Sequence, residues 1–170
     1  MTDAIEVRRG QFLISTDPAR LDLDVIHGFL TQCYWAKGIP PEVVARSIKH
    51  SLCFGIYDEG VEKSPLLGKS ARIGAPGAPQ VGFARVISDF ATIAYLGDVF
   101  VLDSYRGHGL GKWMMECIMR HRSLQGLRRW LLLTRDAHGL YSQFGFTPVK
   151  SPERYMELHQ ADIYKIGKTS

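Results

Sequence analysis

The sequence of 170 residues lacks several features that would place it in other classes of protein. It has no apolar run near the roughly 20 residues needed to cross a bilayer, so we expect no membrane segment. The first residues are acidic and lack the apolar core of a secretory signal peptide. The three cysteines lie far apart without a Cys-x-x-Cys pair, which argues against a disulfide framework or a metal site. These absences predict a cytoplasmic protein that holds no metal.

Charge of one sign is also not in large excess. The net charge is only +4, and a polyanionic cofactor explains some of that excess as well as nucleic acid would. The densest basic cluster, residues 120–122 with 128–129, has no interleaved aromatic side chains for base stacking. We therefore expect a solvated surface there and no nucleic-acid partner.

The hydrophobic periodicity predicts one α/β (α+β) domain over residues 1–170. Strands are expected at residues 11–16, 51–57, 81–88, 91–102, 130–133, 146–149 and 154–158. Helices are expected over residues 22–33, from residue 41, over 110–121 and over 137–144. The order is β-α-α-β-β-β-α-β-α-β-β, with a mainly antiparallel first half and parallel pairing where helices intervene. We expect the strand at 130–133 to be central and buried, and Asp136 to cap the last helix.

Residues 58–79 form an unusual connection between two predicted strands. They contain four glycines and three prolines and show no hydrophobic period. A strand connection normally needs only a few residues, so this segment is predicted to be a flexible inserted loop. It is either an excursion from the domain or a lid over a site.

A glycine-rich loop, Tyr-Arg-Gly-His-Gly-Leu-Gly-Lys at residues 105–112, lies between a predicted strand and a predicted helix. Its backbone amides and the helix N-terminus are suited to an anion such as a diphosphate. The spacing excludes a P-loop, because only three residues separate Gly107 from Gly111-Lys112 and Trp113 follows instead of a hydroxyl residue. It also excludes a dinucleotide fingerprint, because the third glycine comes one residue too early.

Two motifs together resemble one known family. The loop contains Arg-x-x-Gly-x-Gly after a strand, at residues 106–111, and residues 137–146 contain Ala-x-x-Leu-Tyr-x-x-x-Gly-Phe. Both resemble signatures of the Gcn5-related N-acetyltransferase (GNAT) family, in the same order along the chain. The resemblance implies a GNAT fold, with a mixed sheet of about seven strands and four helices, and acetyl-CoA as co-substrate without a metal.

The resemblance also implies which residues hold acetyl-CoA. Val99 and Val101 would offer backbone hydrogen bonds to the pantetheine arm, as an extended ligand adds to a strand edge. One place departs from the family pattern, because Thr134 stands where an Asn often contacts that arm. The expected cofactor-binding residues are Val99, Phe100, Val101, Arg106, Gly107, His108, Gly109, Leu110, Gly111, Lys112 and Thr134.

Two catalytic residues are expected on the same ground. Tyr141 would donate a proton to the departing CoA thiolate, since a phenol is protonated at neutral pH. Asp98 is the leading candidate for the general base, although a strand carboxylate that orients a loop is an equal alternative. Polyamine acetyltransferases of the family carry a Glu-Asp pair where this chain has Gly97 and Asp98. Weaker base candidates are Asp89, His27 and Glu42.

The acceptor is expected at the loop around Tyr34 and Trp35, with Asp98 beside it. The two aromatic rings would form an apolar or cation-binding wall for an amine, or else they only cap the core. The resemblance therefore predicts acetyl transfer to a primary amine of a small molecule, by direct transfer in a ternary complex. The alternative is a non-catalytic acyl-CoA-binding sensor or interaction module. Dimers are common in the family, so a homodimer is an open expectation.

Overall fold

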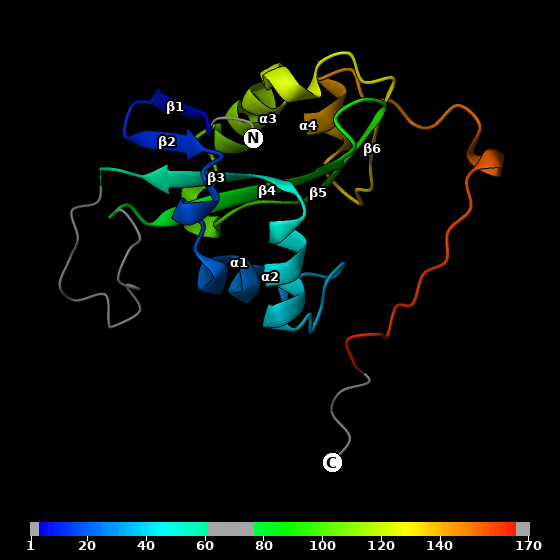
Figure 1. Cartoon of the computed structure of the whole chain (residues 1–170), viewed down its shortest axis with the longest axis horizontal. Coiled ribbons are helices and arrows are strands. Elements are labelled where there is room, and N and C mark those ends of the chain that lie inside the picture. Colours follow the sequence, from blue (N-terminus) through cyan, green and yellow to red (C-terminus); the bar gives the residue numbers. More distant parts are fainter. Residues whose placement is uncertain (1–3, 61–76, 166–170) are drawn as a thin grey trace.

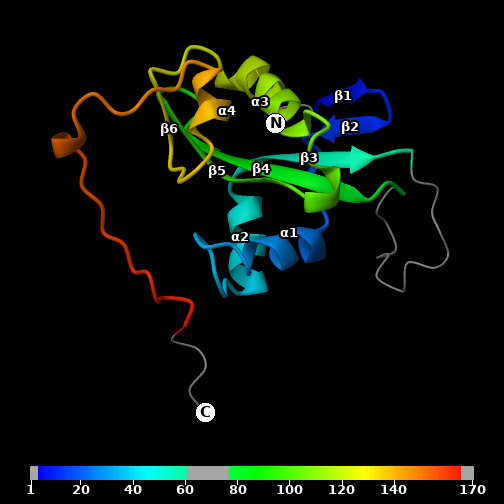
Figure 2. The same ribbon diagram turned by 180° about the vertical axis from the view of Figure 1, so that it is seen from behind.

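The computed structural model describes residues 4–60 and 77–165, which form a single mixed sheet with helices on both faces (Figures 1 and 2). The strands are β1 (Glu6–Arg9), β2 (Phe12–Ser15), β3 (Leu52–Asp58), β4 (Gln80–Ser88), β5 (Ile93–Val101) and β6 (Arg129–Leu132). The helices are α1 (Leu23–Leu30), α2 (Pro41–Lys49), α3 (Leu110–Arg120) and α4 (His138–Ser142). Most of the predicted insertion, residues 61–76, lies outside the described residues.

The six strands lie side by side in chain order, which makes the topology simple. Neighbours from β1 to β5 are antiparallel, and β5 pairs with β6 in parallel after the crossover through α3. This confirms the predicted α+β class, with antiparallel pairing first and parallel pairing where a helix intervenes.

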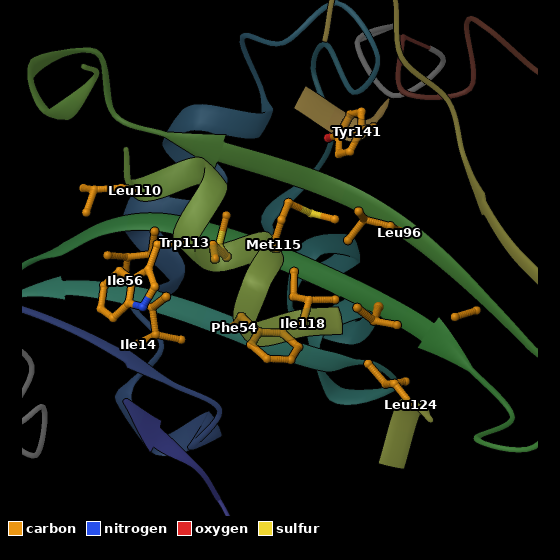
Figure 3. Close-up of a cluster of buried hydrophobic side chains, with 14 of the residues drawn as sticks. Ile14, Phe54, Ile56, Leu96, Leu110, Trp113, Met115, Ile118, Leu124 and Tyr141 are labelled. Carbon is orange, nitrogen blue, oxygen red and sulfur yellow. The ribbon is translucent and has the colours of Figure 1, made fainter. Parts of the chain in front are cut away.

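Two hydrophobic clusters join the helices to the two faces of the sheet. Helix α3 packs on one face and buries Trp113, Met114, Met115 and Ile118 against β3, β4 and β5 (Figure 3). Helices α1 and α2 pack on the other face, where Ile26, Leu30 and Val44 meet side chains of β3 to β5. Both faces of the central strands are therefore covered, and the strand ends remain as places where a ligand could bind.

The start of the sheet differs from the prediction. The prediction missed β1, whose residues are all exposed and include three charged side chains, so they give no alternating hydrophobic signal. A left-handed Gly10, with φ of 58°, makes the tight turn into β2.

The end of the sheet also differs, because the predicted strands at residues 146–149 and 154–158 do not form. Pro148 and Pro152 remove backbone donors from this segment, and Met156 and Leu158 are 97% and 94% exposed. Consequently β6 is an edge strand and not a central buried one, and residues 4–60 and 77–165 form a sheet of six strands where about seven were expected.

Helix α4 is shorter than predicted, and its cap is different. The N-cap residue of α4 is Ala137, whose side chain makes no capping hydrogen bond. The prediction that Asp136 caps this helix was therefore wrong. Instead, the hydroxyl of Thr134 accepts a hydrogen bond from the backbone N–H of Ala137 at 3.0 Å. No helix in the described parts of the chain is long and apolar enough to span a membrane.

Candidate active site

The glycine-rich loop forms a pocket at the N-terminus of α3. The pocket has a volume of about 380 Å³ and is lined by Val101, Tyr105, Arg106, Gly107, Gly109, Leu110 and Gly111. Gly107 and Gly109 adopt left-handed conformations with φ of 84° and 70°, which residues other than glycine rarely adopt. The first amides of α3 have no intrahelical acceptors, so the pocket offers free N–H groups and the positive helix end to an anion.

Charged and aromatic side chains hold the loop in shape. Arg106 pairs with Asp103 at 2.9 Å on the surface, and the His108 ring nitrogen Nδ1 lies 3.1 Å from the carbonyl oxygen of Tyr105. Lys112 is exposed on the first turns of the helix. The predicted diphosphate-binding residues 106–112 thus form the glycine loop and the first turn of α3.

Arg9 is a site residue that the sequence did not reveal. Its guanidinium donates a hydrogen bond to the carbonyl oxygen of Gly109 at 3.1 Å and lies 4.7 Å from the centre of the Trp113 ring. The contact spans 100 positions and starts on the unpredicted strand β1. Gly10, as a turn residue between two extended segments, is the one signal that would have indicated this strand.

The two parallel strands separate beside this pocket. Pairing between β5 and β6 runs from Ile93 with Arg129 to Leu96 with Leu132 and then stops. Residues 97–101 of β5 therefore have no strand partner on the β6 side among the described residues. An unpaired strand edge of this kind is suited to an extended ligand, and it includes the predicted residues Val99, Phe100 and Val101.

A β-bulge lies at the point of separation. Phe83 of β4 pairs with Phe100, whereas Arg85 pairs with Gly97, so β5 carries one extra residue between them. Asp98 lies in this bulge with φ of 54°, a left-handed conformation that Asp tolerates better than most residues. The bulge turns the Asp98 side chain toward the face that α1 and α2 cover.

Both oxygens of Asp98 are engaged. One accepts a hydrogen bond from Nε of Arg85 at 2.7 Å, and the other accepts from the indole N–H of Trp35 at 3.2 Å. The side chains of Arg85 and Asp98 are only 17% and 13% exposed, so this ion pair is largely buried. The carboxylate thereby links the bulge to the loop between α1 and α2.

Tyr34 and Trp35 lie in the loop between α1 and α2 (the acceptor loop), and Tyr34 contacts the loop between β6 and α4. The Tyr34 and Trp35 rings pack edge to face with centroids 5.0 Å apart, and the guanidinium of Arg135 lies 4.0 Å from the centre of the Tyr34 ring. Arg135 belongs to the loop between β6 and α4, which descends toward the α1–α2 loop in both views (Figures 1 and 2). The predicted residues Tyr34, Trp35 and Asp98 are therefore one contiguous group.

Tyr141 lies at the margin of the core, as Figure 3 shows. Its side chain is buried, and its ring packs edge to face with Phe146 at 6.0 Å. Burial raises the pKa of its phenol, and the nearby Tyr34 and Asp136 raise it further. A phenol in this environment stays protonated and remains a proton donor well into the alkaline range.

The weaker base candidates all have structural roles. Asp89 accepts hydrogen bonds from the backbone N–H groups of Ala91, Thr92 and Ile93 and from the Thr92 hydroxyl, and these bonds strongly lower its pKa. The His27 ring lies 3.0 Å from the carbonyl oxygen of Ile39. Glu42 is in the first turn of α2, where a negative charge complements the helix dipole. Within residues 4–60 and 77–165, no group of His, Cys, Asp or Glu is arranged to hold a metal ion.

Known proteins resemble this chain in sequence and in structure. A family model, the acetyltransferase (GNAT) domain, matches residues 76–148. A Gibberella zeae protein named "Putative acetyltransferase FG08082" is 35% identical over 140 residues, which cover 79% of this chain and 78% of the relative.

Solved structures agree with this match. A Xanthomonas campestris protein, described as a "putative acetyltransferase belonging to the gnat family", is 47% identical with a TM-score of 0.78, covering 91% of this chain and 97% of that one. A Staphylococcus aureus protein shares the fold at 21% identity and a TM-score of 0.63, covering 88% of this chain and 99% of that one.

Proposed function

Because this chain belongs to the GNAT acetyltransferase family, we propose that it transfers an acetyl group from acetyl-CoA to a primary amine of a small molecule. The observation that carries the proposal is the unpaired edge of β5 at residues 97–101, which leads directly into the glycine-loop pocket. An extended pantetheine arm ending in a diphosphate has the shape and charge that these two features together would bind.

The residues present fit acetyl-CoA. The backbone of Val99 and Val101 would hold the pantetheine arm, and the amides of residues 107–111 would hold the diphosphate, supported by Arg106 and Lys112. A Cβ at Gly109 would lie 3.7 Å from the Arg9 guanidinium, and the left-handed backbone there disfavours any residue other than glycine. Thr134 already accepts a hydrogen bond from the backbone N–H of Ala137, and its O–H would be the donor to the pantetheine arm.

Acetyl-CoA would supply a reactive thioester, and the protein would position it and move protons. We assign Tyr141 as the proton donor to the leaving thiolate, because its buried phenol is kept protonated. A backbone N–H near Phe100 or Val101 would stabilise the negative charge that develops on the acyl oxygen. Direct transfer in a ternary complex needs no nucleophilic residue in the site.

Asp98 is best suited to a positioning role. Arg85 and Trp35 hold its two oxygens, so its carboxylate fixes the acceptor loop against the bulge. The acceptor loop and the β6–α4 loop meet through Tyr34 and Arg135, and we propose that a small acceptor enters beside this contact. The attacking amine would then enter as its neutral form and lose its proton to water.

The proposal is tested by measuring CoA release from acetyl-CoA by chromatography, across a panel of small amines with a control lacking acceptor. Thiol reagents should not be the only readout, because the chain has three free cysteines. Release that depends on one class of amine supports the proposal. Tight binding of acetyl-CoA without turnover on any amine would instead support a non-catalytic acyl-CoA-binding module, and absence of binding would refute both.

A further inference from the structure

Arg135 is the positive charge that lies at the proposed entrance for the acceptor. Its guanidinium stacks on Tyr34 at 4.0 Å, and Tyr34 is close enough to Tyr141 to raise the pKa of that phenol. The Tyr34 ring also packs on Trp35 with centroids 5.0 Å apart, and the Trp35 indole donates to Asp98 at 3.2 Å. These contacts lead from Arg135 to the bulge, beside the residues proposed to hold the pantetheine arm.

The stacking leaves the guanidinium ready to bind an anion. It uses the flat face of the group, whereas the N–H donors lie in the plane and point outward. The neighbouring carboxylate of Asp136 is 3.8 Å away, beyond hydrogen-bond distance, and both side chains are mostly exposed. Arg135 is thus held in one place while its planar fork remains available to a carboxylate.

Next to the bulge, the described residues offer no carboxylate that lacks a partner. At Gly97, where polyamine enzymes of the family carry Glu, an added Cβ would lie 3.2 Å from the Tyr95 ring. That ring therefore occupies the side-chain space next to the bulge. The carboxylate that follows, Asp98, is already neutralised by Arg85.

From this distribution of charge we infer that the acceptor is an amine that carries its own carboxylate, such as an amino acid, and that Arg135 binds this carboxylate. The inference rests on the proposed acetyl transfer and narrows its substrate class. It makes Arg135 a specificity residue, because it binds the acceptor away from the reacting atoms. The loss of a charged hydrogen bond of this kind typically changes affinity about 10- to 100-fold.

The test compares acceptors that differ only at the carboxylate. L-phenylalanine, L-phenylalaninamide and phenethylamine form one such set, and the corresponding leucine and lysine compounds form two more. The amide matters because its amine is less basic than that of the acid, so a preference for the acid cannot come from a larger neutral fraction. We expect kcat/KM for at least one acid to exceed that of its amide and its decarboxylated amine by about 10- to 100-fold.

The variant Arg135→Gln should remove this preference by raising KM for the acid with little change in kcat. Arg135→Lys keeps the charge but not the planar fork, so it should restore the preference only in part. Arg128→Gln, which also removes an exposed charge but elsewhere on the surface, should leave the preference intact.

The possible failures are distinguishable. Equal or better turnover of the amides and decarboxylated amines would overturn the inference and leave acetyl transfer standing. So would an Arg135→Gln enzyme that keeps the preference for the acid. Acetyl-CoA binding without turnover of any compound would refute acetyl transfer to small amines and the inference with it.

Discussion

The indole N–H of Trp35 donates a hydrogen bond to the carboxylate of Asp98 at 3.2 Å, and so joins the loop after α1 to the bulge in β5. This bond brings an aromatic side chain of the acceptor loop to the point where the two parallel strands separate. Any change at Asp98 therefore affects the acceptor loop and the sheet at the same time.

The Asp98→Asn variant tests the positioning role. Asn tolerates the left-handed backbone and still offers an oxygen to Trp35, but it loses the ion pair with Arg85. We expect the free energy of unfolding to fall by about 1.5–3 kcal/mol, in urea titrations followed by fluorescence. KM for the amine should rise by up to about tenfold, with the shape of the pH–rate profile unchanged. If turnover instead drops on the order of 100-fold and the acidic limb of that profile disappears, Asp98 is the general base.

The Tyr141→Phe variant tests the proton donor. The change removes only the hydroxyl and keeps the ring contact with Phe146, so acetyl-CoA affinity should change little. We expect turnover to fall by about 10²- to 10⁴-fold, the usual contribution of a general acid.

The pH dependence gives an independent check on Tyr141. Burial raises its pKa, so the protonated donor persists to higher pH than a free phenol would allow. The alkaline limb of the turnover profile should therefore lie above about pH 10. Unchanged turnover in the variant, or an alkaline limb near neutrality, would contradict the assignment.

A third prediction concerns the glycine loop. Gly109 caps α3 with φ of 70°, so Gly109→Val strains the backbone by about 1–2 kcal/mol. The added side chain also crowds the Arg9 guanidinium, which lies 3.7 Å from the new Cβ and donates to the Gly109 carbonyl. We expect acetyl-CoA affinity, measured by calorimetry, to fall on the order of 100-fold while the protein still folds. Gly139→Ala is the control, because Gly139 lies in α4 with no atom within 4 Å of the new Cβ. If Gly109→Val still binds acetyl-CoA tightly, the glycine loop does not bind the diphosphate.

The elements that depend on a few neighbouring residues, such as the start of a helix and its buried face, were predicted correctly from the sequence. The glycine spacing at residues 107–111 identified the start of α3, and the apolar period that follows identified its buried face. In the same way, Pro41 marked the first turn of α2, because its fixed φ suits that position.

The features that were missed depend on residues far apart in the sequence. Strand β1 is polar and forms only because β2 offers an edge to pair with, so Arg9 was missed with it. The stacking of Arg135 on Tyr34 spans two loops and has no signature in either. The apolar residues at 154–158 suggested a strand by pattern, but no neighbouring strand pairs with them in the described chain.

A fourth prediction uses two glycines that respond in opposite ways to the same substitution. In β3 a Cβ at Gly55 would lie 2.6 Å from Cζ of Tyr57, whose ring is fully buried. We expect Gly55→Ala to lower the free energy of unfolding by about 1–3 kcal/mol through overpacking. Gly28→Ala, on the exposed side of α1 with no atom near the new Cβ, should raise it by about 0.5–1 kcal/mol. Equal effects in urea titrations would show that Tyr57 does not restrict Gly55.

The last prediction concerns His121, a buried residue at the end of α3 that has no part in the proposed chemistry. Its Nδ1 accepts a hydrogen bond from the backbone N–H of Ser123 at 3.3 Å, and its Nε2 is buried without a partner among the described residues. Burial lowers the pKa of the ring, and the nearby Arg122 lowers it further, so the folded protein holds this histidine neutral.

The sign of the effect on stability follows from that lowered pKa. The unfolded chain binds a proton near pH 6.5 and the folded chain does so only at lower pH, so the stabilisation is complete above about pH 6.5. It is lost as the pH falls from there toward the folded pKa, with a slope of at most about 1.4 kcal/mol per pH unit. The variant His121→Asn keeps an oxygen acceptor for Ser123 but does not titrate. Urea titrations from pH 7.5 to 5.5 should therefore show the wild type losing its advantage over the variant as the pH falls, because protonation penalises only the wild type. A difference that stays constant with pH would mean that His121 is protonated equally in the folded and unfolded chains.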